Sequence, residues 1–180
     1  IHYLTENEIN ENKDYLNSFI KKDERIIWTL IMGGPTKYYD YSIKNIKEIF
    51  ITLSELSKKL NFQLVVIPSM RTPANIIQYA KEYFGDDHTV IIDVDKKAYL
   101  SALAIAQKII VTCDSSSMIS EAALTGKPIY VATILPKKND KRFKKFRNLF
   151  SELNIIKNLG EKIEDWNYEK LDETNRVANI

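Results

Sequence analysis

Val111 to Pro128, V-T-C-D-S-S-S-M-I-S-E-A-A-L-T-G-K-P, is the stretch of the chain that decides its fold. It begins as the end of a β-branched strand, passes through a polar turn into a helical run, and stops at Gly126, with Pro128 before the next apolar segment. Because glycine and proline break regular structure, this order predicts a strand, a helix and a second strand in succession. That succession is the βαβ unit of a parallel sheet.

The same alternation of short apolar runs and longer helical patterns continues on both sides of this stretch. The runs are nearly continuous in apolar residues, as expected of strands that are covered on both faces. We therefore predict a doubly wound parallel α/β sheet of the Rossmann type, with strands at Arg25 to Met32, Gln63 to Ile67, Thr89 to Ile92, Lys108 to Thr112 and Pro128 to Ala132. The predicted helices are Ile43 to Leu60, Pro73 to Phe84, Lys97 to Ala106, Ser117 to Leu124 and Asp140 to Leu153.

The two ends of the chain carry separate expectations. Thr5 and Glu8 have the spacing of a capping box, which predicts a charged helix from Glu6 to Lys21. Since the chain begins at Ile1 rather than Met, we expect residues 1–24 to be a linker or leading helix from a missing upstream domain. At the other end, a short closing helix is expected from about Asp172.

Composition excludes several classes of protein. The chain has 180 residues, 44% hydrophobic and 28% charged, which is ordinary for a soluble domain, and its net charge of +2 is too small to indicate a nucleic-acid partner. Cys113 is the only cysteine, so an intramolecular disulfide is excluded and a reducing compartment is the simpler assumption. No apolar run approaches the roughly 18 residues of a membrane span, and no signal peptide is apparent. We expect a cytoplasmic protein; membrane association is left open, with no feature that indicates it.

Candidate binding groups follow the first predicted strand, because ligands of open parallel sheets lie beyond the carboxyl ends of the strands. Gly33 and Gly34 lack a Cβ and would let the backbone approach a bulky or charged group, although a tight turn explains such a pair equally well. Lys37, a few residues on, would add positive charge.

Arg71 follows the second predicted strand. Thr72 and Pro73 are expected to cap and to begin the next helix, which places Arg71 at a helix N-terminus. A cation is electrostatically disfavoured there, so Arg71 is a candidate for bidentate binding of phosphate or carboxylate. The alternative is a solvated loop arginine.

The turn from Asp114 to Ser117 is the strongest candidate for an anion site. Asp114, Ser115, Ser116 and Ser117 bring three hydroxyls and several free backbone N–H groups to a helix N-terminus, where the hydrogen bonds and the helix dipole both favour a diphosphate. Glu121 lies four residues after Ser117, one turn along the same face, where its carboxylate would accept hydrogen bonds from a ribose diol. The alternative is an N-cap run followed by an exposed glutamate.

D-S-S-S-M-I-S-E-A-A-L-T-G-K-P-I-Y-V, residues 114–131, resembles the signature block of the mitochondrial-fission (elongated-mitochondria) family and its bacterial relatives, which are similar to glycosyltransferases of the GT-B architecture. G-G-P-T-K-Y-Y, S-M-R-T-P, R-F-K-K-F and L-D-E-T-N-R-V-A match that family in the same order, at residues 33–39, 69–73, 142–146 and 171–178. The resemblance implies that residues 25–180 are the nucleotide-sugar-binding, C-terminal half of a GT-B protein. It implies that the nucleotide is faced by Gly33, Gly34, Arg71, Asp114, Ser115, Ser117 and Glu121.

The resemblance leaves three functions open. The first is metal-independent glycosyl transfer from a nucleoside diphosphate sugar, with the diphosphate held by the helix near Ser115 and by Arg71, assisted by Lys37 or Lys127. The upstream domain would then supply the acceptor site and the catalytic base, so we assign no catalytic residue and leave open whether this chain is an enzyme by itself. The second is a non-catalytic interaction platform, and the third is a nucleotide-sugar epimerase of the same architecture.

Two further patterns receive structural interpretations. Asp93-Val94-Asp95 spells the D-x-D sequence with which other glycosyltransferases bind a divalent metal, but Asp95 also suits the N-cap of the next helix, so we assign no metal and no other cofactor. Seven of the eleven residues from Lys137 to Arg147 are basic. We interpret them as the solvated face of a packed helix, whose apolar stripe consists of Phe143, Phe146, Leu149, Phe150 and Leu153.

Overall fold

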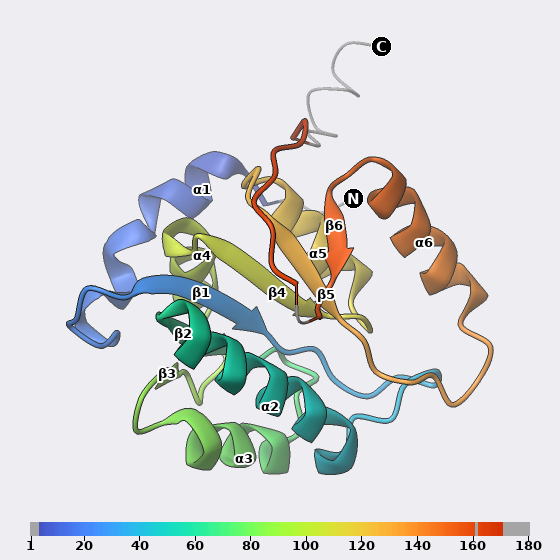
Figure 1. The fold of residues 1–180 in the computed structure, drawn as a ribbon, viewed down its shortest axis with the longest axis horizontal. Coiled ribbons are helices and arrows are strands. Elements are labelled where there is room, and N and C mark those ends of the chain that lie inside the picture. Colours follow the sequence, from blue (N-terminus) through green and yellow to red (C-terminus); the bar gives the residue numbers. More distant parts are fainter. Residues whose placement is uncertain (1–3, 161, 171–180) are drawn as a thin grey trace.

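A computed structural model describes residues 4–160 and 162–170, which form one parallel sheet with helices on both faces (Figure 1). The sheet order is β3-β2-β1-β4-β5-β6, so the predicted doubly wound α/β fold is confirmed. The strands are β1 Ile26–Ile31, β2 Phe62–Ile67, β3 Thr89–Val90, β4 Lys108–Thr112, β5 Ile129–Ala132 and β6 Ile156–Asn158. The sequence does not predict β6, because its three residues contain a single apolar side chain.

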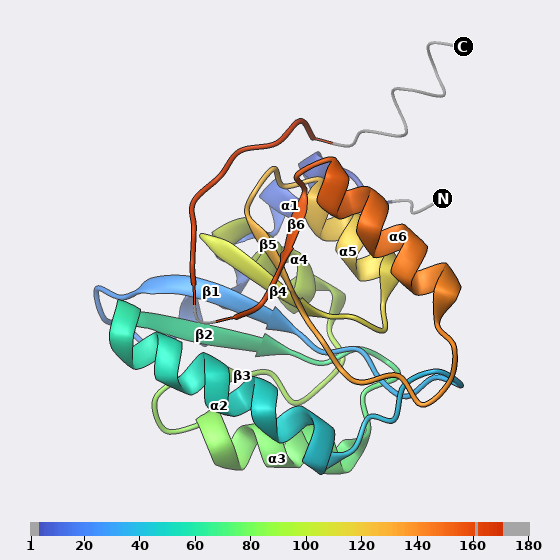
Figure 2. The same ribbon diagram turned by 45° about the vertical axis from the view of Figure 1, so that its right-hand side comes forward.

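Two sets of helices cover the sheet, and the predicted positions of the five main helices are confirmed to within one or two residues. Figure 2 shows α2 and α3 over one face, with α4, α5 and α6 over the other. The helices are α1 Glu6–Glu11, the 3-10 helix η1 Lys13–Ser18, α2 Ile43–Leu60, α3 Ala74–Phe84, α4 Lys96–Ile105, α5 Ser116–Ala123 and α6 Lys141–Glu152. None of these helices is both long and apolar enough to cross a bilayer.

The core lies between the sheet and its two helical layers. Trp28 of β1 stacks on Phe62 of β2 with ring centroids 3.8 Å apart. The predicted stripe of α2 is buried, because Ile46, Phe50 and Leu53 are each at most 1% exposed. The stripe predicted for α6 is buried only in part. Phe150 faces the core, whereas Leu149 and Leu153 are 52% and 49% exposed.

The leading segment packs onto α4. The capping box of Thr5 and Glu8 is confirmed, but α1 ends at Glu11 and the chain continues as the 3-10 helix η1, so the predicted continuous helix to Lys21 is wrong. The Asn12 side chain donates to Glu8 O at 2.8 Å, and such local bonds compete with continuation of a helix. Leu16 of η1 is fully buried.

The final described segment, residues 162–170, crosses the sheet over β4 and β5 without forming a helix. Trp166 meets Tyr130 of β5 edge to face, with ring centroids 5.2 Å apart. The Tyr168 hydroxyl donates to Lys127 O at 2.7 Å. The closing helix predicted from about Asp172, and the resemblance motif at 171–178, lie outside the described residues.

Candidate functional site

The loops after β1 and β4 meet where the order of the sheet reverses. Strands β1 and β4 are neighbours in the sheet but lead to helices on opposite faces, and Rossmann-like sheets bind their ligands at such a switch point. The Gly33 N–H donates to Thr112 Oγ1 at 2.9 Å, and the Gly34 N–H donates to Asp114 Oδ2 at 2.9 Å. These bonds fix the loop after β1 against the start of the turn that precedes α5.

Arg71 joins this contact from the loop after β2. Its Nη2 lies 3.1 Å from Asp114 Oδ2, and its Nη1 donates to Gly34 O at 3.1 Å. The Asp114 side chain is fully buried, whereas 42% of the Arg71 side chain is exposed. Asp114 is thus placed to hold Arg71 rather than to touch a ligand, and Arg71 retains a face toward solvent.

The Asp114 carboxylate is an unusual buried group. Burial raises the pKa of Asp114, although the Gly34 N–H and Arg71 act in the opposite direction. Its Oδ1 atom has no hydrogen-bond partner among the described residues. Buried polar atoms in proteins nearly always have a hydrogen-bond partner, so a carboxylate oxygen without a donor is an exception.

The glycine pair is explained by these contacts. A Cβ on Gly33 would collide with the Asp114 carboxylate, and a Cβ on Gly34 would collide with the backbone of Arg71. The charged group that the backbone approaches is therefore Asp114 of the chain itself. Both glycines are buried, so they shape the site without offering an exposed surface of their own.

Thr72 does not cap α3 as the sequence predicts. Pro73 occupies the N-cap position, without a side-chain cap. The Thr72 hydroxyl lies 2.7 Å from Gly33 O and accepts from the Ser69 N–H at 2.8 Å. This threonine thus ties the loop after β2 to the loop after β1, because the hydrogen-bond partners offered by the neighbouring loop replace those of its own helix.

The N-terminus of α5 offers free donors next to Arg71. Ser115 is the N-cap, and its Oγ accepts from the Met118 N–H at 3.4 Å. No described residue offers an acceptor to the N–H of Ser116 or Ser117, and Ser117 is exposed. Two unpaired N–H groups at the positive end of a helix favour an anion, as the serine run predicts.

Glu121 has a partner that the sequence does not reveal. Its Oε2 accepts a short hydrogen bond from the hydroxyl of Tyr99 on α4. Burial, and then the charge of Glu121, raise the pKa of Tyr99 well above its usual value, so the phenol stays protonated and donates. No described residue donates to Oε1 of Glu121. Tyr99 precedes Glu121 by 22 residues and lies on another helix, so no local pattern connects them.

Neither of the two lysines pairs with the described residues of this centre. Lys37 is exposed, and its Nζ stands 5.0 Å from the centroid of the neighbouring Tyr38 ring. Lys127 comes just before β5, at the amino ends of the strands, whereas the candidate site lies at their carboxyl ends. Its Nζ donates to Leu103 O and Ala104 O at 2.8 and 2.6 Å. The expectation that Lys127 assists the diphosphate is therefore wrong, since its ammonium caps the C-terminus of α4.

Asp95 is the N-cap of α4, as the sequence predicts. Its Oδ1 accepts from the N–H groups of Lys97 and Ala98 at 2.8 and 3.3 Å, and its Oδ2 from the Tyr15 hydroxyl at 2.5 Å. Across residues 4–160 and 162–170, no three His, Cys, Asp or Glu side chains gather where they could hold a metal ion. Cys113 is a buried free thiol.

A second cluster, missed by the sequence reasoning, joins the loop after β1 to α6. The Tyr39 hydroxyl contacts Asp140, and Arg147 Nη1 donates to Tyr39 Oη at 2.9 Å and to Cys113 O at 3.3 Å. Arg147 Nη2 lies 3.1 Å from Asp140 Oδ2. Tyr39 and Arg147 are 108 residues apart in the chain, so only the folded structure brings them together. The cluster holds α6 beside the turn that begins at Asp114.

The strand order and the loops at the switch point define a Rossmann-like α/β domain. Two solved structures share the fold. The UDP-GlcNAc 2-epimerase of Neisseria meningitidis bound to UDP-GlcNAc is 18% identical, with a TM-score of 0.53 over 85% of this chain and 36% of that protein. The UDP-GlcNAc 2-epimerase of Methanocaldococcus jannaschii is 16% identical, with a TM-score of 0.54 over 85% and 39%.

The chain belongs to the family described as Mitochondrial fission ELM1, whose model matches residues 1–180. The uncharacterized protein RP120 of Rickettsia prowazekii (strain Madrid E) is 33% identical over 166 residues, which are 84% of this chain and 44% of that protein. The mitochondrial fission protein ELM1 of Arabidopsis thaliana is 30% identical over 115 residues, 61% of this chain and 26% of that protein. The chain therefore spans less than half the length of these relatives, and the resemblance inferred from the sequence motifs is confirmed.

Proposed function

We propose that this chain binds the nucleoside diphosphate part of a nucleotide sugar at the carboxyl edge of its sheet. The observation that carries the proposal is the combination of unpaired N–H groups at Ser116 and Ser117 with the guanidinium of Arg71. Asp114 and Gly34 O hold that guanidinium, so it is oriented before any ligand arrives. Preorganised donors around a fixed position favour an anion without further ordering of the protein.

The diphosphate would need no metal ion at this site. Arg71 supplies a full positive charge and the N-terminus of α5 supplies about half a charge, together with directed N–H donors. The nearby carboxylate, Asp114, is fully buried and already faces Arg71. Asp95, the alternative metal ligand, is engaged by two backbone N–H groups and by Tyr15. The same donors would stabilise a departing nucleoside diphosphate.

Glu121 would bind the ribose diol. It lies four residues beyond Ser117, which corresponds to a rise of roughly 6 Å along α5. Tyr99 occupies one oxygen of its carboxylate and orients it, while Oε1 remains available to sugar hydroxyls. A carboxylate accepts hydrogen bonds from hydroxyls and repels phosphates, so phosphate and ribose would bind to different parts of the same helix.

The reaction itself depends on residues beyond this site. Glycosyl transfer requires an acceptor site and a base that activates the attacking hydroxyl, and neither is assigned to this chain. The two solved structures compared above are UDP-GlcNAc 2-epimerases, and the chain covers at most 39% of either one. Both a glycosyltransferase and an epimerase are therefore consistent with the proposed nucleotide-sugar site.

An interaction platform without catalysis is the second candidate. It is favoured by the relative from Arabidopsis thaliana, which is described as a mitochondrial fission protein rather than as an enzyme. The two candidates differ in one measurable property. A platform that has lost its ligand has no reason to bind nucleotides through Arg71, whereas a donor domain does.

A thermal-shift screen with nucleoside diphosphates, UDP-GlcNAc and inorganic pyrophosphate tests the proposal. A ligand at 100 times its Kd stabilises the fold by about 2.7 kcal/mol, which for a chain of this size raises Tm by about 5–10 °C. Arg71→Gln should abolish the shift, whereas Arg142→Gln, an exposed arginine on α6, should retain it. Absence of any shift, or equal behaviour of the two variants, would overturn the proposed site.

A further inference from the structure

The charge of this chain is concentrated around one helix. Residues 135–153, comprising α6 and the loop before it, contain seven of the 26 basic residues and two of the 24 acidic ones, so they carry a net charge of +5. The rest of the chain then carries −3, although the total is only +2. A small net charge therefore conceals a strongly positive face, and such a face attracts anionic partners at long range.

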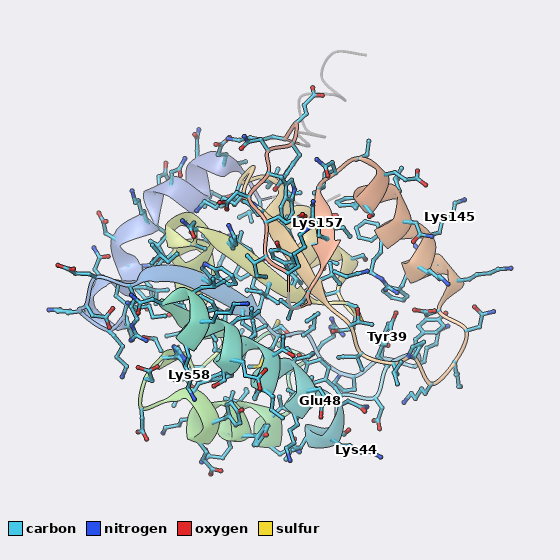
Figure 3. All side chains as sticks on the ribbon, in the orientation of Figure 1. Tyr39, Lys44, Glu48, Lys58, Lys145 and Lys157 are labelled. Carbon is cyan, nitrogen blue, oxygen red and sulfur yellow. The ribbon has the colours of Figure 1, made fainter. Side chains whose placement is uncertain are left out.

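The cations of this face are free to bind a partner. Lys141, Arg142, Lys144 and Lys145 are exposed, and none of them forms a salt bridge within the described part of the chain. Figure 3 shows Lys145 on the outer side of α6, projecting away from the sheet. Arg147 differs from them, because it pairs with Asp140 and faces inward.

Apolar side chains lie among these cations. Leu149 and Leu153 are 52% and 49% exposed, and Phe146 is half-buried. Positions 142, 145, 146, 149 and 153 recur at helical spacing, so basic and apolar side chains share one flank of α6. Arg142, Lys145, Phe146 and Leu149 line one shallow hollow on that flank. A helix that only solvates its outer face has no need for exposed leucines in the centre of a basic patch.

We propose that the outer flank of α6 docks on the surface of an anionic lipid bilayer. The lysine and arginine head groups would meet lipid phosphates, while their aliphatic stems and the two leucines would enter the boundary between head groups and acyl chains. Basic residues beside a membrane each add to the attraction toward anionic lipids, and exposed leucines add apolar burial. A nucleic acid would bind the basic side chains and leave the leucines in water. The presence of both basic and apolar side chains on this flank therefore favours a lipid surface.

Co-sedimentation of the chain with vesicles tests the charge contribution. The chain should bind vesicles of phosphatidylcholine that contain about one third phosphatidylglycerol, and it should not bind vesicles of pure phosphatidylcholine. High salt should dissociate it from the anionic vesicles. Replacing Lys141, Arg142, Lys144 and Lys145 by Gln should weaken binding by about 100-fold or more. The matched control replaces Lys44, Lys47, Lys58 and Lys59 of α2 by Gln, which removes the same charge from the face that carries Lys44 and Lys58 in Figure 3. That control should bind within about 3-fold of the parent chain.

The apolar contribution is tested by Leu149→Gln with Leu153→Gln, which should weaken vesicle binding by about 10-fold. The matched control is Ile43→Gln with Leu60→Gln, two residues of α2 that are 40% and 39% exposed, and it should leave binding unchanged. A single-stranded RNA oligonucleotide serves as the alternative polyanion. Absence of vesicle binding, equal losses from the α6 and α2 variants, or binding of RNA that exceeds vesicle binding and ignores the two leucines would each overturn the proposal.

Discussion

Glu121→Ala should weaken the binding of nucleoside diphosphates while sparing pyrophosphate. The carboxylate stands one turn beyond the free N–H groups of α5, with one oxygen fixed by Tyr99. Hydrogen bonds from a diol to the remaining oxygen are charge-assisted and worth about 1.5–3 kcal/mol, which corresponds to a loss of about 10- to 150-fold in affinity. Titration calorimetry of the parent chain and of Glu121→Ala, each with a nucleoside diphosphate and with pyrophosphate, measures this loss directly.

Inorganic pyrophosphate distinguishes the role of Glu121 from that of Arg71. Pyrophosphate has no ribose, so its affinity for Glu121→Ala should stay the same or rise slightly, because a nearby negative charge has been removed. Arg71→Ala should weaken both ligands. This pattern of selectivity separates a diol-binding carboxylate from a general loss of the site.

The same substitution has a cost in stability that can be measured independently. Removing Glu121 leaves the hydroxyl of Tyr99 without its acceptor, which costs about 1–2 kcal/mol in the free energy of unfolding. Tyr99→Phe removes the donor as well, so the double variant should be less destabilised than the sum of the two single variants. If Glu121→Ala folds and leaves nucleotide affinity unchanged, Glu121 is only the partner of Tyr99 and its assignment to ribose is refuted.

Three further predictions rest on individual contacts, and a fourth concerns turnover. Lys127→Met should lower the free energy of unfolding by about 1–2 kcal/mol, because two carbonyls at the end of α4 lose their donor. It should leave nucleotide affinity intact. A loss of affinity would show that Lys127 contributes to the nucleotide site after all. Gly34→Ala should lower the free energy of unfolding by about 1–3 kcal/mol through its clash with the Arg71 backbone. Gly160→Ala should change it by no more than about 0.5 kcal/mol, because no described residue lies within 4 Å of the added Cβ. Equal urea midpoints for the two variants would contradict this. Burial lowers the pKa of His88 below 6.5, and its Nδ1 accepts a hydrogen bond from the Leu64 N–H at 3.1 Å, so the fold favours the neutral imidazole. The stability that this gives above pH 6.5 should be lost as the pH falls through the lowered pKa. His88→Gln should flatten this pH dependence in urea unfolding. Finally, this chain alone should release no nucleoside diphosphate from a nucleotide sugar above the rate of solvent hydrolysis, and turnover would require a base among its own residues.

Local patterns in the sequence predict the fold because they are set by neighbouring residues. Asp95 is recognised as a cap because the helix that it caps follows immediately, and the strands are recognised because each is a continuous apolar run. The β6 strand is missed because pairing with β5, rather than its own composition, makes Ile156–Asn158 a strand. The width of the buried face of α6 is likewise set by its neighbours, so helical spacing alone assigns Leu149 to the core incorrectly.

The candidate site is predicted less completely, because its contacts join distant parts of the chain. Arg71 and Asp114 are 43 residues apart, and no local pattern indicates that the carboxylate is buried and holds the guanidinium. The glycine pair suggests a close approach, but only the structure shows that the group approached is Asp114. The serine run before α5 is recognised correctly as a helix N-terminus, since capping is a local property.

Calorimetry of nucleoside diphosphate binding with and without a chelator tests whether the site works without a metal ion. We expect the chain to bind UDP or another nucleoside diphosphate equally well in EDTA and in magnesium, and Arg71→Ala to weaken the binding to the same extent in both. Asp95→Ala should bind like the parent chain, because Asp95 serves as the cap of α4. Binding that appears only with a divalent cation and disappears in Asp95→Ala would show instead that Asp95 holds a metal ion for the diphosphate.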